Sequence, residues 1–137
     1  MPFSFFRKSD KPTNYGERQK WAYKTRPGEE SSTVIINKVE AHPKLGNIYQ
    51  ISVTGIRIKN PAGQRGVQVE LPHFPVSLTT LEQSLTNFIG QTKPTPGYLD
   101  GYNEWKAAFD QGNAGIFTIT VAEIVDIVES TLGADLP

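Results

Sequence analysis

Apolar and polar residues alternate most clearly along residues 47–60. Apolar side chains occupy the odd positions from Tyr49 to Val53, which is the two-residue period of a strand with one buried face. After Gly55 the apolar side chains fall on even positions, at Ile56 and Ile58. A bulge at Gly55 would absorb this shift, because one extra residue lets the strand keep a single inward face. We therefore predict a long central strand that bends at Gly55.

Three further segments carry a strand pattern and are joined by short links: Trp21–Thr25, Ser32–Glu40 and Val67–Leu71. Proline, glycine and polar residues punctuate the links, as they do at turns. Four successive strands with short links favour an antiparallel meander. Ile116–Ile119 is another β-prone run, and we expect any fifth strand to form there.

A helical period replaces the two-residue period after the fourth strand. Apolar residues then recur at spacings of three and four, which predicts an amphipathic helix over Ser77–Gly90. A second helix is predicted over Leu99–Gln111, with its aromatic residues on one face. Thr120 and Glu123 have the spacing of a capping box, so a third helix is predicted to begin there.

These elements predict a single α+β domain. We expect a sheet of four or five mainly antiparallel strands in a meander, with two or three helices packed mostly on one face. The chain has 137 residues, which is a usual length for one domain. Residues 1–20 show no period and are predicted to form a flexible N-terminal arm, which leaves residues 21–137 for the domain.

The composition excludes several kinds of site. The chain has no cysteine, which excludes disulfides, thiolate nucleophiles and cysteine-ligated zinc. His42 and His73 lie in different predicted loops without ligand spacing, so we predict no metal site, and we expect no cofactor. No apolar run approaches the ~20 residues that cross a bilayer. The N-terminus places apolar residues before basic ones, the reverse of a secretory signal, and we therefore predict a cytoplasmic protein.

Charge is balanced over the whole chain but is unevenly distributed. The formal net charge is zero, which argues against general nucleic-acid binding because such binding depends on neutralising many phosphates. Residues 1–26 are mainly basic. Residues 99–137 carry a single basic side chain, Lys106, and the following acidic ones: Asp100, Glu104, Asp110, Glu123, Asp126, Glu129 and Asp135.

The acidic C-terminal part suggests a surface for a basic protein partner. Glu123, Asp126 and Glu129 lie on the polar side of the last predicted helix, and we predict that they form this surface. An ordinary solvated helix side is the alternative interpretation. Tyr98 and Tyr102 border a loop rich in proline and glycine, where exposed aromatic rings would suit a protein interface.

A small-molecule pocket between sheet and helices is the alternative to partner binding. Arg26 can pair with a carboxylate or phosphate, Glu29 belongs to an adjacent acidic pair, and His73 can act as a base near neutral pH. In the plainer interpretation Arg26 forms a salt bridge with Glu29 or Glu30, and His73 bonds a neighbouring backbone group. No phosphate-binding glycine loop and no nucleophile elbow accompanies these residues.

Two stretches, Trp21–Glu30 and Ile51–Pro61, resemble small uncharacterised bacterial α+β proteins that are similar to immunity proteins of toxin systems. The resemblance implies a cytoplasmic protein that binds another protein, and it assigns no functional residue because it contains no catalytic motif. We therefore expect a non-enzymatic protein-binding module of the immunity type, with a basic toxin domain as its partner. The alternative is a small-molecule-binding protein or small enzyme. Self-association through an exposed strand edge, giving a homo-oligomer, is a third hypothesis.

Overall fold

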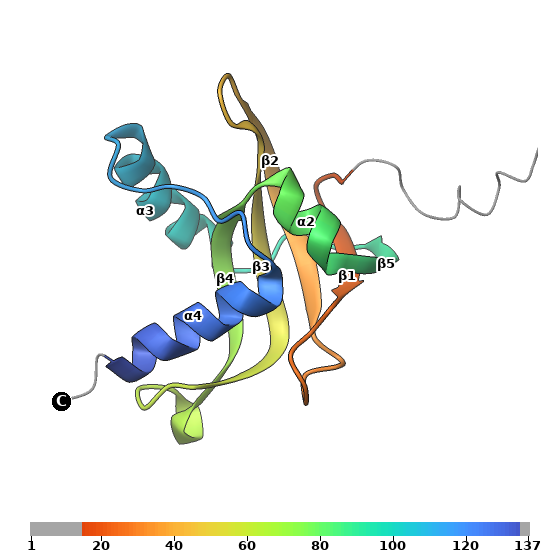
Figure 1. Ribbon diagram of the computed structural model, residues 1–137, viewed down its shortest axis with the longest axis vertical. Helices are drawn as coiled ribbons and strands as arrows, with labels where there is room; N and C mark the ends of the chain where they lie inside the picture. Colours follow the sequence, from red (N-terminus) through yellow and green to blue (C-terminus); the bar gives the residue numbers. More distant parts are fainter. Residues whose placement is uncertain (1–14, 135–137) are drawn as a thin grey trace, which may run out of the picture.

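The computed structural model describes residues 15–134, and these residues form one sheet with helices packed against it (Figure 1). The strands are β1 (Gln19–Tyr23), β2 (Thr33–His42), β3 (Gly46–Lys59), β4 (Val67–Val76) and β5 (Leu85–Gln91). The helices are α2 (Leu78–Ser84), α3 (Tyr98–Asp110) and α4 (Val121–Ala134), and a short 3-10 turn, η1 (Gln64–Gly66), precedes β4. The predicted α+β class is confirmed, since the sheet is antiparallel with the strand order β4-β3-β2-β1-β5.

The first four strands form the predicted meander, in which each strand pairs with the next along the chain. Helix α2 then leads from the β4 edge of the sheet to the opposite edge, where β5 pairs with β1. Helices α2 and α4 lie together on one face of the sheet (Figure 1). Helix α3 lies against the other face, where Tyr102 binds Glu40 of β2 and packs on His73 of β4.

The helix predicted over Ser77–Gly90 is wrong in its second half. The helix ends at Ser84, and Leu85–Gln91 forms the edge strand β5. Phe88 in this strand packs edge-on against Trp21, with ring centroids 5.5 Å apart. Aromatic and β-branched residues in the segment favour a strand, and β1 offers it a free edge. The helical spacing of the apolar residues does not reveal that edge, because β1 is distant in the sequence.

The fifth strand expected at Ile116–Ile119 does not form. Phe117 makes one isolated bridge to Val76, and the Thr80 hydroxyl donates to the Ile119 carbonyl at 2.7 Å. The segment is therefore irregular in structure and is hydrogen-bonded to the end of β4 and to α2. The fifth strand of the sheet is β5 instead.

The predicted bend in β3 is confirmed. Its pairing with β4 changes register between Thr54 and Ile58, and Gly55 has a φ of 80°, in the left-handed region. Apolar residues on both sides of the bend are buried in the same core. The prediction of one buried face is wrong for this strand, however, because Gln50 and Ser52 on the opposite face are fully buried as well.

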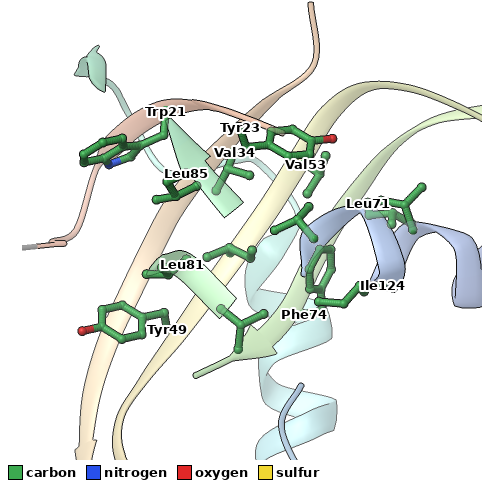
Figure 2. Packing of buried hydrophobic residues seen from close by; sticks show 14 of the residues in the cluster. Trp21, Tyr23, Val34, Tyr49, Val53, Leu71, Phe74, Leu81, Leu85 and Ile124 are labelled. Atoms are coloured by element: carbon green, nitrogen blue, oxygen red, sulfur yellow. The ribbon is translucent and has the colours of Figure 1, made fainter. Parts of the chain in front are cut away.

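The hydrophobic core lies between the sheet and helices α2 and α4. Figure 2 shows Phe74 of β4 beside Ile124 of α4. All five strands and both helices contribute to this cluster: Trp21, Tyr23, Val34, Ile36, Tyr49, Ile51, Val53, Ile56, Ile58, Leu71, Phe74, Val76, Leu81, Leu85, Val121, Ile124 and Val125. Burial of this apolar surface is the main favourable contribution to folding.

The folded domain begins before residue 21. Strand β1 starts at Gln19, and Tyr15 packs edge-on against Trp21 with ring centroids 5.3 Å apart. Residues 15–20 therefore belong to the domain and not to the predicted arm. The rest of that arm, residues 1–14, lies outside the described residues.

The other two predicted helices form close to their expected positions. Helix α3 begins at Tyr98, one residue before the predicted start. The capping box of α4 is present, because the Thr120 N–H donates to the Glu123 carboxylate at 3.0 Å and the Glu123 N–H donates to the Thr120 hydroxyl at 3.2 Å. Among residues 15–134, no helix has the length and apolar character needed to cross a membrane.

Replacement of Gly55 by alanine is expected to destabilise the protein through both backbone strain and close contact. A Cβ at this position would lie 3.0 Å from the Ser32 Cα. Gly46→Ala is the matched control, because Gly46 also has a positive φ but nothing lies within 4 Å of an added Cβ. We expect G55A to lower the free energy of unfolding by about 2–3 kcal/mol and G46A by about 1 kcal/mol, measured by urea denaturation. Equal losses would show that the approach to Ser32 has no energetic effect.

Candidate functional site

The sheet face opposite the core carries buried polar side chains. The Asn37 amide donates to the Ser52 hydroxyl at 3.3 Å, and its carbonyl oxygen accepts the Thr95 N–H at 2.8 Å. The hydroxyls of Ser52 and Thr95 are also hydrogen-bonded to each other. All three residues are at most 5% exposed. These bonds hold the loop before α3 against a sheet face that, in an antiparallel sheet, commonly faces water.

A second hydrogen-bonded chain runs from β4 through β3 and β2 to α3. The Gln50 amide nitrogen donates to the Glu40 carboxylate at 2.8 Å, and the other Glu40 oxygen accepts the Tyr102 hydroxyl at 3.0 Å. His73 Nε2 lies 2.6 Å from Gln50 Oε1. Because the oxygen of Gln50 can only accept, Nε2 of His73 is the donor and carries the proton of the imidazole.

Burial shifts the ionisation of two groups in this chain. Burial lowers the pKa of His73 to about 4, against a smaller opposing effect of the Glu40 carboxylate. Burial, and then the hydrogen bond to Glu40, raises the pKa of Tyr102 to about 12. Both groups are therefore uncharged near neutral pH, and the imidazole is a weak base there.

Helix α3 rests on this polar layer through aromatic rings. Trp105 stacks on Phe109 with ring centroids 4.6 Å apart, and Tyr102 and Trp105 lie 6.1 and 6.2 Å from the His73 ring. Gly101 permits this approach, because a Cβ there would lie 2.9 Å from the His73 Cβ. No residue of α3 is buried. The helix is thus held on the sheet without entering a hydrophobic core.

Arg26 is the centre of a second cluster, which joins the loop after β1 to α4. Its guanidinium donates twice to the Glu29 carboxylate, at 3.0 and 2.7 Å, and also binds Asp126 at 3.1 Å and Glu129 at 2.8 Å. Two parallel N–H···O bonds are the strongest arginine–carboxylate geometry. Glu29 is only 4% exposed, so this ion pair is shielded from solvent.

Two of these carboxylates, those of Glu29 and Glu129, also accept hydrogen bonds from the backbone of β3. The pairing of β3 with β2 ends at Thr54, so β2 offers no partner to the residues that follow. The Arg57 N–H donates to Glu29 at 2.7 Å, and the Lys59 N–H donates to Glu129 at 2.6 Å. Unpaired strand N–H groups cost free energy when buried and invite pairing with another chain when exposed. The two carboxylates therefore take the place of a missing neighbouring strand.

Hydrogen bonds also determine the ionisation of this cluster. Burial acts to raise the pKa of Glu29, but hydrogen bonds from Arg26 and from the Arg57 N–H outweigh it and lower that pKa. The Lys59 N–H and then Arg26 lower the pKa of Glu129. Glu29 above all raises the pKa of Arg26. All of these groups are charged near neutral pH.

The structure places the residues of the predicted pocket in two separate sites. Arg26 and Glu29 form the salt bridge that the plainer interpretation predicted, with a shortest distance of 2.7 Å. His73 lies under α3 and shares no bonded partner with them, so the three side chains do not line one pocket. Two residues of the predicted partner surface, Asp126 and Glu129, join Arg26 instead.

The remaining predicted residues have structural contacts of their own. Glu123 is exposed and caps α4 through Thr120. Tyr98 is half-buried at the start of α3, and Tyr102 belongs to the hydrogen-bonded chain through Glu40. The structure therefore brings Tyr98 and Tyr102 together on α3 but separates them from the carboxylates of α4.

Sequence reasoning missed the polar layer formed by Asn37, Glu40, Gln50 and Ser52, in which Glu40 is half-buried and the other three are buried. Polar residues that alternate with apolar ones in a strand are ordinarily directed to water, so the pattern over residues 49–53 assigned Gln50 and Ser52 to the surface. The available signal was the aromatic face of the helix over Tyr98–Asp110, which requires a surface to lie on.

Within residues 15–134, no three side chains of metal-binding type are grouped to hold an ion. Comparisons of the chain with protein-family models, with curated proteins and with solved structures found no match. Function therefore has to be inferred from the geometry of this chain.

Glu29→Gln is expected to destabilise the protein, because it removes the charge that Arg26 and the Arg57 N–H share. We expect a loss of about 2 kcal/mol in the free energy of unfolding, measured by urea denaturation at pH 7. Glu30→Gln is the matched control, since Glu30 is exposed and accepts from the Gly28 N–H but forms no salt bridge with Arg26. Its stability should equal that of the wild type. Equal stability of both variants would contradict the role given to Glu29.

The lowered pKa of His73 predicts a loss of stability in mild acid. Its folded-state pKa lies below the unfolded value, so the stabilisation is complete above about pH 6.5 and is lost as the pH falls toward 4. Between pH 7 and 5 the wild type should lose about 1–2 kcal/mol in the free energy of unfolding, by urea denaturation at each pH. His73→Gln should show a much flatter profile, with His42 retained in both proteins. Parallel profiles would refute the assignment. Glu29 and Glu129 do not account for the slope, because hydrogen bonds lower the pKa of both carboxylates.

Proposed function

We propose that this protein is a non-enzymatic protein-binding module that engages its partner through the exposed surface of α3. The observation that carries the proposal is that α3 contains no buried residue although it carries four aromatic side chains. Helices of a self-contained domain normally bury an apolar stripe. Aromatic side chains that stay partly exposed on a helix are typical of the energetically dominant residues of protein interfaces.

The apolar surface of α3 extends beyond the aromatic rings. Leu99 is 54% exposed, at the N-terminal end of the helix and one turn from Tyr102. The layer beneath the helix is polar, and the helix is attached through rings and through the Tyr102 hydroxyl. A partner that covers Leu99 and the ring edges would remove from water the apolar surface that the sheet leaves exposed.

The charge of α3 favours a partner with a basic surface. Asp100 and Glu104 are exposed, lie one turn apart, and form no ion pair with any described residue. Like charges at this spacing destabilise an isolated helix slightly, and a basic partner would relieve that repulsion. The basic partner expected from the acidic C-terminal part is thus kept, but its contact surface moves from α4 to α3.

Helix α4 is a weaker candidate for the same role. Asp126 and Glu129 bind Arg26, and Glu123 binds Thr120. A partner that used these carboxylates would compete with bonds that hold the fold together. The immunity-type role, the toxin partner and the cytoplasmic location remain predictions of the sequence.

Self-association remains a separate hypothesis, with β5 as its candidate edge. No strand of the described chain pairs with the outer side of β5, and Leu85–Gln91 contains neither a charged residue nor a proline. The opposite edge strand, β4, contains Pro72 and Pro75, which lack the N–H groups needed for strand pairing.

The test is a comparison of Leu99→Gln with Ile127→Gln. Ile127 is a matched control because it is 47% exposed on α4, so both changes put one neutral polar side chain on an exposed apolar helix position. Wild-type protein is used to capture partners from a lysate of the source organism, and affinities for the recovered partner are then measured by calorimetry. We expect L99Q to weaken binding at least about tenfold and I127Q to leave it unchanged. Recovery of no partner, or loss of binding with I127Q alone, would contradict the proposal.

A further inference from the structure

A cavity of about 650 Å³ lies where β3 bends and turns back into β4. It is lined by Gly55, Ile56, Arg57, Arg65, Val67 and Val69. A second cavity of about 480 Å³, beside the Arg26 cluster, also has Arg57 in its wall. Arg57 therefore lines both cavities, and it lies in the part of β3 that is not paired with β2.

The two arginines of the larger cavity form no ion pair with any acidic side chain of the described chain. Arg57 and Arg65 are exposed, and neither forms an ion pair there. The acids close to Arg57 are already engaged, because Glu29 and Glu129 bind Arg26 and the strand N–H groups. Within the described chain, two guanidinium groups are thus left without an ion-pair partner, beside Glu29 and Glu129 carboxylates that Arg26 already binds.

Arg65 is held in an unusual backbone conformation. Its φ is 58°, in the left-handed region that residues with a side chain seldom adopt. The turn around it is closed by hydrogen bonds from the Gly66 N–H to Gly63 at 3.1 Å and from the Asn60 N–H to Gly66 at 2.9 Å. The turn consequently fixes the backbone of this arginine before any ligand binds. Less conformational entropy is then lost on binding.

The floor of the cavity is apolar. Val69 is 58% exposed, the most exposed large apolar residue of the described chain, and Val67 beside it is half-buried. A ligand that fits this surface presents carboxylates to the arginines and an apolar group to the valines. An extended peptide meets both demands, because its alternate side chains point in opposite directions.

We infer that this cavity is a binding site for an extended acidic peptide segment of a partner protein. Carboxylates of the segment pair with Arg57 and Arg65, and an apolar side chain of the segment packs on Val69. A nucleic-acid strand would satisfy the arginines alone, and the neutral net charge of the chain disfavours it. The site is distinct from the surface of α3 and does not depend on the function proposed for that helix.

The inference is tested with a short fluorescein-labelled peptide that alternates glutamate and valine, with the full-length protein at low salt. Fluorescence anisotropy gives its affinity, and a peptide with glutamine in place of glutamate is the matched ligand control. Arg57→Gln and Arg65→Asn should each weaken binding of the acidic peptide about tenfold, since each removes a charge-assisted contact. Asparagine suits the left-handed conformation, so the Tm of R65N should not fall. Lys44→Gln, at an exposed site in the β2–β3 turn, removes one charge elsewhere and should have no effect.

The location of the peptide is read from amide chemical shifts, which should change at Gly55, Arg57 and Val69 and not on α3. Equal binding of the glutamate and glutamine peptides would overturn the inference, as would wild-type affinity in both arginine variants. Tighter binding of a single-stranded oligonucleotide with the same arginine dependence would replace the peptide with a nucleic acid. Absence of binding up to millimolar peptide would also overturn it.

Discussion

The structure depends on a mismatch in length between two neighbouring strands. β3 continues beyond Thr54, where its pairing with β2 ends, and its exposed backbone groups need other partners. Glu29 and Glu129 accept the N–H groups of Arg57 and Lys59, and Arg26 binds both carboxylates. This arrangement closes the sheet edge, orders the loop after β1 and anchors α4. Two candidate pocket residues, Arg26 and Glu29, and two candidate partner residues, Asp126 and Glu129, thus belong to one structural cluster.

The two faces of the sheet have different chemistry, and this difference decides which side chains stay exposed. The face under α2 and α4 is a continuous apolar core. The face under α3 is a polar layer in which Gln50 and Ser52 are buried but hydrogen-bonded. Such a layer fixes the position of α3 through directional bonds but takes little apolar surface out of water. Leu99 and the exposed edges of the α3 rings therefore remain in contact with solvent, whereas Asp126 and Glu129 of α4 are bonded to Arg26.

Much of the fold was predictable from local patterns, and the candidate sites were predictable only in part. The meander, the bend at Gly55 and the capping box at Thr120 were each visible in a few adjacent residues. The pairing of Arg26 with Glu29 was visible for the same reason. The bond between Arg26 and Asp126 spans a hundred residues of sequence, and no local pattern indicates it. The prediction of a helix through Gly90 failed because the free edge of β1 outweighed a helical spacing of apolar residues.

The sequence by itself determined the α+β class, the strands of the meander, and the helices over Tyr98–Asp110 and Val121–Ala134. These elements were visible because periods of two and 3.6 residues depend only on neighbours along the chain. Tertiary structure alone decided that Leu85–Gln91 is a strand, that Gln50 is buried, and that Glu29 and Glu129 complete β3. Each of these outcomes depends on which distant group fills a vacant hydrogen-bonding position. Satisfying every buried donor and acceptor is a property of the whole fold and leaves no local period in the sequence.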